Sequence, residues 1–460
     1  MRGWLKVNFN INIPDGANLL IHTLQDNGYS AYVVGGCVRD SILGREPHDW
    51  DICTSATPEQ MLEVFKDRRV IETGLQHGTI TVVVDKTPYE ITTYRIDGDY
   101  SDNRRPDSVT FTDNLIEDLK RRDFTINAMA YNDTQGLIDP FGGIEDIECG
   151  KIQCVGSAKE RFNEDALRIL RAIRFASQLE FSIEPETDWQ IHQLYKNLEN
   201  ISVERINSEF CKIASFDNFC VELLLYKDVF SLFVPELKDI IDFPQNNPWH
   251  IYNVFDHTVH AVAECDSKDL ITRLAVFFHD FGKAHSYQDG EDGVRHFKGH
   301  AKVSADMTDS IMKRLRFDND TRNKVVELVQ YHDATIPVGK KYTKKWLNKI
   351  GEEQFRRLLK LKEADNKAQN IERSNERIGE LSEIEFLIDE VLKEQECFSL
   401  KDLAVKGQDL IEIGYKPGRV LGTALKGLLD CVIAEEVENN KIELLKIAKE
   451  WLKFEVFLSH

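Results

Sequence analysis

The 460-residue sequence lacks long hydrophobic runs, an excess of positive charge and paired cysteines. No apolar stretch approaches the roughly 18 residues that a membrane-spanning helix needs, and the most apolar window, 221–234, is interrupted by Lys227 and Asp228. Residues 1–14 have neither the apolar core nor the small-residue cleavage site of a signal peptide. The nine cysteines include no Cys-x-x-Cys pair, which is typical of reduced thiols. These absences predict a soluble cytoplasmic protein with no membrane association.

Negative charge dominates the chain, whose formal net charge is −20. This balance argues against a protein that coats nucleic acid through bulk positive charge. It leaves open a protein that binds nucleic acid through local basic clusters, of which residues 120–122 and the arginines between 161 and 174 are the clearest. Apolar residues make up 42% and charged residues 30%, a globular balance, and the length indicates several domains.

The residue pattern changes about one third of the way along the chain. Short β-branched and aromatic runs at 31–34, 79–85 and 89–94 predict strands, and 3.6-residue periodicity dominates from about 143 onward. Residues 161–179 are predicted to form one helix. The fold class is therefore α+β, with a mixed α/β head followed by an all-helical neck, body and tail. The predicted bounds are 1–142 for the head, 143–240 for the neck, 241–370 for the body and 371–460 for the tail.

Three carboxylates and a glycine turn in the head form a candidate catalytic site. Asp49 and Asp51 are two residues apart, so on a strand they would share a face and reach one hard cation. Glu90 lies in a second predicted strand, and the three together could hold Mg²⁺ for in-line phosphoryl transfer. Upstream, the Gly35-Gly36 turn can bring backbone N–H groups against a phosphate, to which Arg39 can add a charge-assisted contact.

The motifs around these residues carry a resemblance to a known family. VGGCVRD at 34–40 followed by HDWDI at 48–52 resembles the signature of the polymerase-β superfamily, and more narrowly of class II tRNA nucleotidyltransferases, the CCA-adding enzymes. Three further blocks agree with that family, namely RRDFTINAM at 121–129, DPFGG at 139–143 and EDALRILRAIR at 164–174. SVERI at 202–206 fits a later block of the family. The resemblance covers about residues 30 to 235. It implies template-independent addition or repair of the 3′-terminal CCA of tRNA from CTP and ATP, with Mg²⁺ held by the head.

The matched blocks assign nucleotide-binding roles. Gly36 and Arg39 would lie against phosphate, and Arg122 can reach the triphosphate or the primer end. Asp123 and Asn127 suit contacts with sugar hydroxyls, and in the family this block accompanies preference for ribose. The alternative is that Asp123 caps the following helix and Asn127 is structural.

A second group of matched residues lies in the neck. Asp165 and Arg168 are i and i+3 on the predicted helix, so their side chains would lie side by side. The carboxylate accepts hydrogen bonds and the guanidinium donates them. Side by side, the two groups complement the Watson–Crick edges of cytosine and adenine and do not match those of uracil and guanine. Arg171 and Arg174 continue the spacing and can reach triphosphate or base. The alternative is an amphipathic helix with surface ion pairs.

The body contains a second constellation of possible metal ligands. His257, His279-Asp280 and Asp365 resemble the ligand pattern of HD-family phosphohydrolases, which implies a divalent transition metal and a second, hydrolytic activity. His300 and His332 are extra ligands of the kind that recruit a second ion, and Asp333 rivals Asp365 as the last ligand. The alternative is a degenerate HD fold without chemistry.

Three other functions are compatible with parts of the pattern. An A-adding enzyme or a poly(A) polymerase would share most head motifs, and the acidic C-terminal part weighs against the polymerase. The polar loop at 97–107, which CC-adding relatives typically lack, favours an enzyme that can add the terminal adenosine, and an A-only enzyme also fits. An HD phosphohydrolase could use the head only to bind RNA. A non-catalytic RNA-binding protein would be expected to have lost Asp49 or Asp51.

Overall fold

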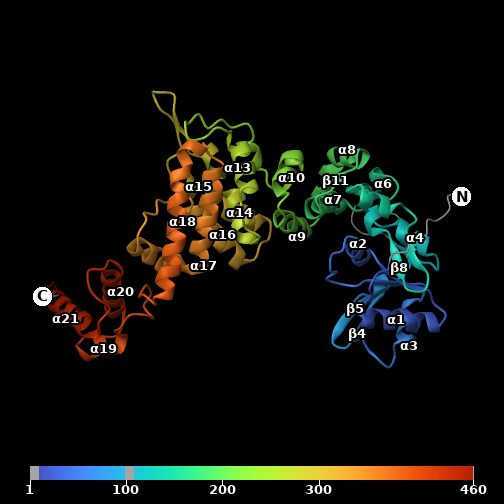
Figure 1. Ribbon diagram of the computed structural model, residues 1–460, viewed down its shortest axis with the longest axis horizontal. Coiled ribbons are helices and arrows are strands. Elements are labelled where there is room, and N and C mark those ends of the chain that lie inside the picture. The colour runs from blue at the N-terminus through green and yellow to red at the C-terminus, as the bar shows by residue number, and fades with distance from the viewer. Residues whose placement is uncertain (1–9, 99–107, 459–460) are drawn as a thin grey trace. The chain divides into compact units, whose positions relative to one another are not determined.

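The computed structural model describes residues 10–98 and 108–458, and it divides into two compact units at Val234 and Pro235. Unit 1 contains the predicted head and the predicted neck up to Val234, and unit 2 contains residues 235–240 of the predicted neck with the predicted body and tail (Figure 1). A mixed α/β part followed by helices confirms the predicted fold class. The four domain bounds stay predictions. None of the described helices is long and apolar enough to cross a membrane.

Among the described residues, unit 1 is built on a seven-stranded sheet with the order β3-β4-β5-β2-β1-β8-β9. Its strands are β1 (Ala31–Val34), β2 (Ile52–Thr54), β3 (Arg69–Ile71), β4 (Thr79–Val84), β5 (Thr87–Thr93), β8 (Ala130–Asn132) and β9 (Gly136–Ile138). Neighbours run antiparallel except β2 and β5, which pair in parallel with Ile52 opposite Ile91. If the parallel register is extended by one residue before this pair, Asp51 lies opposite Glu90. The two carboxylates are therefore side by side where the chain enters β2.

The local predictions in the head are mostly confirmed. The strand at 31–34 is present as predicted, and those at 79–85 and 89–94 correspond to β4 and β5 with shifted ends. The expectation that Asp49 and Asp51 lie on a strand was wrong, because β2 begins only at Ile52. The two carboxylates lie in the segment that leads into the sheet, where Asp51 O still accepts a hydrogen bond from Val34 N.

The helices of unit 1 surround the sheet and then continue as the neck (Figure 1). They are α1 (Asp15–Asp26), α2 (Gly36–Ile42), α3 (Pro58–Val64), α4 (Leu115–Lys120), α5 (Gly143–Glu148), α6 (Ala158–Glu164), α7 (Leu167–Leu179), α8 (Pro185–Leu194), α9 (Val203–Ala214), α10 (Phe219–Leu225) and α11 (Lys227–Phe233). Small two-stranded pairings join β6 (Arg95–Asp97) to β7 (Val109–Phe111) and β10 (Lys151–Ile152) to β11 (Ser182–Ile183).

The single helix predicted over 161–179 was wrong, because the chain breaks between α6 and α7. Asp165 has extended backbone angles, φ −133° and ψ 103°. Its Oδ1 accepts a hydrogen bond from Leu167 N at 3.1 Å, so the side chain satisfies one of the free amides at the start of α7. A short polar side chain that bonds the nearby backbone in this way competes with continuous helix.

The neck buries a carboxyl group outside the predicted site residues, that of Glu222. Glu222 on α10 is only 3% exposed, and Phe210, Phe219 and Phe230 pack edge to face with one another in the same part of the chain. Burial, with a smaller contribution from the charge of Asp188, raises the pKa of Glu222 to about 8. Its Oε2 has no hydrogen-bond partner within the described part of the chain.

Replacing Glu222 with Gln is expected to stabilise unit 1 at alkaline pH. Since the folded-state pKa is about 8 and the ordinary value 4.5, folding takes up a proton between these values and stability falls as pH rises through this window. Glu222→Gln removes that penalty, so we expect a gain of about 2 kcal/mol above pH 8 and little gain near about pH 5. Thermal unfolding across pH measures it, with the exposed Glu204→Gln as the matched control. An equal effect at both pH values would contradict it.

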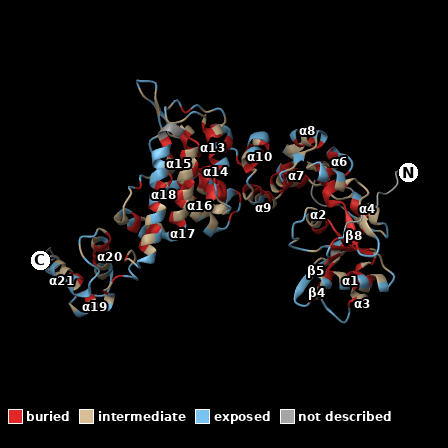
Figure 2. Ribbon diagram, in the orientation of Figure 1, coloured by how far each residue is buried: buried red, intermediate tan, exposed pale blue. Residues whose placement is uncertain are grey.

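Unit 2 is helical apart from one short β-pairing among its described residues. Its helices are α12 (Leu237–Ile240), α13 (Val254–Ala263), α14 (Leu270–Phe278), α15 (His300–Arg314), α16 (Asn319–Tyr331), α17 (Lys340–Lys367), α18 (Ile371–Lys393), α19 (Gly407–Glu412), α20 (Arg419–Ile433) and α21 (Lys441–Leu458), with β12 (Gln288–Asp289) paired to β13 (Arg295–His296). Figure 2 shows α13 and α14 as the most thoroughly buried part of this unit. The last three helices enclose a separate apolar cluster that includes Leu410, Leu428 and Leu444.

Candidate functional site

The three predicted catalytic carboxylates lie together at the edge of the β2–β5 pair. The parallel register places Asp51 beside Glu90, and Asp49 is close enough for its negative charge to raise the pKa of Asp51. Burial and then the negative charge of Asp49 raise the pKa of Asp51 to about 6, with Glu90 adding to the rise and Arg122 opposing it. Like charges are therefore held close to one another here, which is the arrangement that a divalent cation would stabilise.

The glycine turn faces this edge from the start of α2. Gly35 has φ 81° and ψ −126°, a conformation that favours glycine, and a Cβ there would lie 3.1 Å from Arg122 Nη1. Gly36 follows as the first residue of α2, where a Cβ would lie 3.7 Å from an Arg39 nitrogen. Arg122 is held by Asp118, whose Oδ2 accepts a hydrogen bond from Arg122 Nη2 at 3.3 Å. The turn thus brings bare backbone next to two guanidinium groups.

A continuous hydrogen-bonded chain joins the head to the neck. Arg39 Nη1 donates to Asn127 Oδ1 at 2.6 Å, and Asn127 Nδ2 donates to Asp123 Oδ1 at 3.2 Å. The other oxygen of Asp123 accepts from Arg171 Nε at 2.7 Å. Burial would raise the pKa of Asp123, but Arg171 and Arg168 outweigh it and hold the pKa well below the ordinary value. Asp123 also accepts from Phe124 N at 2.8 Å, so it both fixes the local backbone and anchors Arg171.

The side chains of Asp165 and Arg168 do not pair with each other, although Arg168 N donates to Asp165 O at 3.0 Å. Asp165 Oδ2 accepts from Arg205 Nη2 at 3.0 Å, whereas Arg168 donates to Glu164 Oε2 at 2.6 Å and to Arg121 O at 2.9 Å. The helix break places the Asp165 carboxylate away from the helical position that the i, i+3 argument assumed. The two side chains are close in sequence but are held by separate partners.

One aromatic ring organises three of the predicted nucleotide-binding arginines. The guanidinium carbons of Arg39, Arg171 and Arg174 lie 5.0, 5.5 and 4.1 Å from the centroid of Phe175. Arg174 also forms an ion pair with Glu209 at 2.9 Å, and burial lowers its pKa to about 10 against that opposing charge. Cation–π contacts and buried carboxylates therefore fix these cations in position before any ligand binds.

Unit 2 brings four histidines and two aspartates into one cluster, although they come from five separate segments of the chain. His257 and His279 lie with Asp365, and His300 and His332 lie with Asp280. In all four imidazoles Nδ1 faces a backbone carbonyl, at 3.3 Å for His257, 2.7 Å for His279, 2.8 Å for His300 and 2.7 Å for His332. An Nδ1–H that donates to a carbonyl leaves Nε2 with a free lone pair, which is the tautomer that ligates metal.

Short contacts connect the two aspartates to these rings. Asp365 Oδ1 lies 3.0 Å from His257 Nε2 and 3.7 Å from His279 Nε2. Asp280 Oδ2 lies 3.1 Å from His279 Nε2 and 2.7 Å from Lys283 Nζ. Burial disfavours a charged imidazole at His279, yet Asp280 and Asp365 raise its pKa to about 10. Two carboxylates in contact with buried imidazoles form a site that a cation would stabilise.

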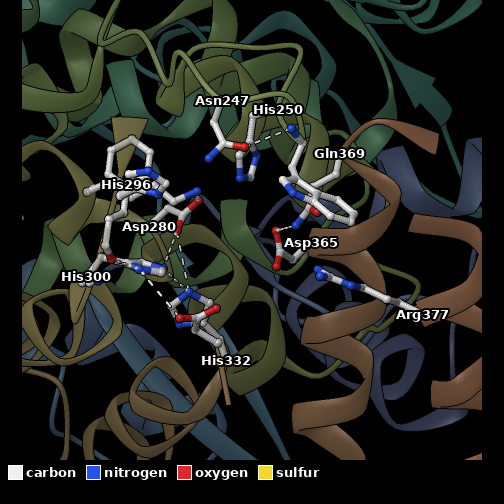
Figure 3. Close-up of a pocket in the computed structure, with 14 residues that line it drawn as sticks. Asn247, His250, Asp280, His296, His300, His332, Asp365, Gln369 and Arg377 are labelled. Carbon is white, nitrogen blue, oxygen red and sulfur yellow. Dashed lines mark hydrogen bonds and ion pairs between the residues drawn. The ribbon is translucent and has the colours of Figure 1, made fainter. Parts of the chain in front are cut away.

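Four members of the cluster line a cavity of about 290 Å³, namely Asp280, His300, His332 and Asp365 (Figure 3). Figure 3 shows Asp280, His300 and His332 on one side and Asp365, Gln369 and Arg377 on the other. Asp333, the rival of Asp365, also lines the cavity, but its side chain is 66% exposed and its oxygen is 4.0 Å from Nδ1 of His300. The geometry favours Asp365 over Asp333 as a ligand.

Comparison with known proteins gives family matches along both units. The description "Poly A polymerase head domain" matches residues 31–153, a probable RNA- and SrmB-binding site of polymerase A matches 180–241, and a tRNA nucleotidyltransferase domain 2 matches 288–448. A CCA-adding enzyme of Lactobacillus johnsonii is 50% identical over 212 residues, 45% of this chain. The chain spans about half the length of that relative, 52%.

A longer match decides the family. A CCA-adding enzyme of Leuconostoc mesenteroides is 34% identical over 439 residues, covering 95% of this chain and 96% of that one. The chain belongs to the CCA-adding enzyme family. A solved CCA-adding enzyme of Bacillus stearothermophilus, in complex with CTP, is 28% identical with a TM-score of 0.68, covering 95% of this chain and 98% of that one.

The residues that hold the predicted site residues in place were not predicted from the sequence. Asp118, Glu164 and Glu209 each bind a predicted nucleotide-binding arginine or its neighbour. Arg205 pairs with Asp165 across 40 residues, and its only sequence signal is its place in the SVERI block at 202–206. In the second cluster, Gln245 accepts from Lys283 and Gln369 donates to Asp365. Glu209, Arg205 and Gln245 meet partners from distant segments, which spacing along the chain could not reveal. Asp118, Glu164 and Gln369 lie three or four residues from their partners.

Proposed function

We propose that this chain adds or repairs the 3′-terminal CCA of tRNA without a nucleic acid template, using CTP and ATP. The observation that carries the proposal is the carboxylate edge of Asp49, Asp51 and Glu90 beside the Gly35-Gly36 turn, in a member of the CCA-adding family. The neighbouring cations Arg39 and Arg122 suit the triphosphate. A cytoplasmic location fits tRNA as the partner and stays a prediction.

The chemistry needs an in-line displacement at the α-phosphorus of the nucleotide. The 3′ oxygen of tRNA forms a bond to phosphorus, the bond to pyrophosphate breaks, and the proton of the 3′ hydroxyl is released. Asp49, Asp51 and Glu90 offer only oxygen ligands and repel one another, which fits Mg²⁺. Bound Mg²⁺ would activate the hydroxyl and neutralise charge on the phosphates. Arg39, Arg122 and the Gly36 amide would orient the triphosphate, with Asp123 and Asn127 at the ribose.

Base selection is assigned to Asp165 and Arg168, with Arg171 and Arg174 placed to contact triphosphate or base. Asp165 accepts and Arg168 donates, so the pair complements cytosine and adenine. In the free chain Arg205 and Glu164 hold these side chains apart, which is consistent with exchange of both partners for a nucleotide.

Replacing Asp165 with Asn is expected to relax base selection by about 10- to 100-fold toward UTP or GTP, because an amide both donates and accepts. Incorporation of each labelled nucleotide into tRNA lacking CCA measures it, read by product length. The exposed Glu160→Gln in α6 is the matched control. Unchanged selectivity against UTP and GTP would place the template elsewhere.

The same length-resolved assay with the unaltered chain tests the proposed function as a whole. Addition of C, C and A in that order supports it, addition of adenosine alone indicates an A-adding enzyme, and long adenosine tails indicate a poly(A) polymerase. Most of the 97–107 loop that favours adenosine addition lies outside the described residues, since the gap covers 99–107. No incorporation of any nucleotide would overturn the proposal.

A second activity is favoured by the histidine–aspartate cluster of unit 2. His257, His279, Asp280 and Asp365 fit the HD-type set for a divalent transition metal. Ligand atoms of His257, His279 and Asp365 lie within 4.8 Å of one another, Asp280 Oδ2 lies 3.1 Å from His279 Nε2, and Nδ1 of both rings faces a backbone carbonyl. We propose a metal-dependent phosphohydrolase. A 2′,3′-cyclic phosphate or 3′-phosphate on damaged tRNA is the expected substrate, because removing it restores the hydroxyl that the head extends. Phosphate release from such ends across added Mg²⁺, Mn²⁺, Co²⁺ and Ni²⁺ tests it.

A further inference from the structure

One buried carboxylate in the head binds two consecutive arginines. Asp118 Oδ1 on α4 accepts from Arg121 Nε at 3.0 Å and from Arg121 Nη2 at 2.8 Å, and Asp118 Oδ2 accepts from Arg122 Nη2 at 3.3 Å. Burial would raise the pKa of Asp118, but the charges of Arg122 and Arg121 lower it, so the carboxylate is ionised. Asp118 is 1% exposed, which leaves no surface for a nucleotide. Its role is therefore exerted through the two arginines.

The two arginines differ in how much of each guanidinium is already bound. Arg121 gives Nε and Nη2 to Asp118 and directs Nη1 toward Asp97 Oδ2 at 3.7 Å. Arg122 donates to Asp118 through Nη2, and its buried Nε has no hydrogen-bond partner within the described ranges. Arg122 Nη1 lies against the glycine turn, 3.1 Å from the place that a Cβ on Gly35 would take. Arg122 therefore keeps donors for a phosphate, whereas Arg121 is a structural bridge.

The contacts of Asp118 extend to the catalytic edge and to the β6–β7 pair. Burial and Asp49 raise the pKa of Asp51 and Arg122 opposes them, so the Arg122 guanidinium lies within electrostatic reach of the carboxylates. Asp118 Oδ1 also accepts from Arg95 N, at the start of β6, at 3.2 Å. One ionised side chain thus fixes Arg122 and the first residue of β6 together.

We propose that Asp118 is a positioning residue for nucleotide binding, which holds the Arg122 guanidinium toward the triphosphate. With Nη2 fixed, the planar guanidinium keeps its place beside the glycine turn, so less side-chain entropy is lost when a phosphate binds. The choice of CTP as the ligand rests on the proposed function. Because the triphosphate is bound both before and during the reaction, loss of this positioning should raise the KM for CTP rather than lower kcat.

CTP binding with Mg²⁺ but without tRNA, and steady-state incorporation into tRNA lacking CCA, test the inference on the full chain. For Asp118→Asn we expect the Kd and the KM for CTP to rise about 10- to 30-fold, with kcat within about threefold. The preference for CTP over UTP should stay unchanged, because Asp165 is untouched. The matched control is Glu117→Gln, since Glu117 on the same helix is 38% exposed and pairs with Lys120 at 3.8 Å. It should leave the Kd and the KM unchanged.

A double-mutant cycle with Arg122→Gln separates positioning from a purely structural role. If Asp118 acts through Arg122, adding Asp118→Asn to Arg122→Gln should raise the KM by less than about twofold. A general loss of structure would instead give the full effect in both backgrounds. If Asp118→Asn does not fold, Asp118→Glu replaces it in the same cycle, because it keeps the charge but displaces the carboxylate by one methylene. We then expect a rise of about 3- to 10-fold that again disappears with Arg122→Gln.

The outcomes separate this inference from the proposed reaction. An unchanged Kd for CTP in the folded Asp118 variant, equal effects in both backgrounds, or an altered preference for CTP over UTP would overturn the positioning role and leave the reaction standing. CTP binding by the unaltered chain without any incorporation would overturn the reaction. In that case the Kd values alone decide the role of Asp118.

Discussion

Asp51→Asn is expected to lower the rate of CTP incorporation into tRNA by at least about 10²- to 10³-fold, with little change in tRNA affinity. The amide keeps the size of the side chain but loses the charge that makes the edge of Asp49, Asp51 and Glu90 attractive to Mg²⁺. Because neutralising Asp51 also relieves repulsion among the carboxylates, the folded state should not lose stability. Single-turnover extension of tRNA lacking CCA, with binding measured separately, distinguishes the two effects.

A matched control for this substitution is Asp85→Asn. Asp85 is an exposed carboxylate in the turn between β4 and β5, and its positive φ of 48° is a conformation that Asn also tolerates. We expect wild-type incorporation from this control. Substantial CTP incorporation by folded Asp51→Asn would remove Asp51 from the catalytic assignment.

The second large effect is expected in unit 2, where Asp280→Ala should abolish metal-dependent release of phosphate from cyclic-phosphate tRNA ends and leave CCA addition intact. Asp280 contacts three of the four histidines within 3.4 Å and Lys283 at 2.7 Å, so its loss removes a ligand and leaves Lys283 without its ion pair. Asp49→Ala should have the opposite effect, because its carboxylate lies in the head. Both reactions are measured on the same preparations.

Asp333→Asn serves as the control for the second effect. This aspartate lines the same cavity but is mostly exposed, so its replacement should change phosphate release by less than about threefold. Phosphate release that persists in folded Asp280→Ala, or that needs no added metal in the unaltered chain, would leave the cluster without the proposed chemistry. Loss of CCA addition in Asp280→Ala would contradict the independence of the two sites.

Local sequence was sufficient for much of the head. The strand at 31–34, the glycine turn and the proline-initiated helix α3 depend on neighbouring residues, and Thr57 and Gln60 form the capping box that begins α3. The motif order identified the family that the Leuconostoc mesenteroides relative supports over 95% of the chain. Such features are readable because turns, caps and short motifs involve interactions over a few residues.

Helical periodicity was less reliable where a polar side chain competes with the backbone. The apolar spacing of 161–179 predicted one helix, but Asp165 bonds Leu167 N and ends α6 at Glu164. The same break explains why Asp165 and Arg168 have different partners. Apolar periodicity predicts which face of a helix is buried. It does not predict a break at a single residue whose backbone leaves helical geometry.

The sequence by itself determined which residue types were available for chemistry: three carboxylates near a glycine turn, four arginines in the neck, and the histidines and aspartates of unit 2. Only the tertiary structure decided how they are joined, because each decisive contact closes a long loop. Asp165 meets Arg205, Asp123 meets Arg171, and Asp365 meets His257 across 108 residues. The two oxygens of Asp280 face different histidine pairs for the same reason, since the directions of side chains from separate helices depend on how those helices pack.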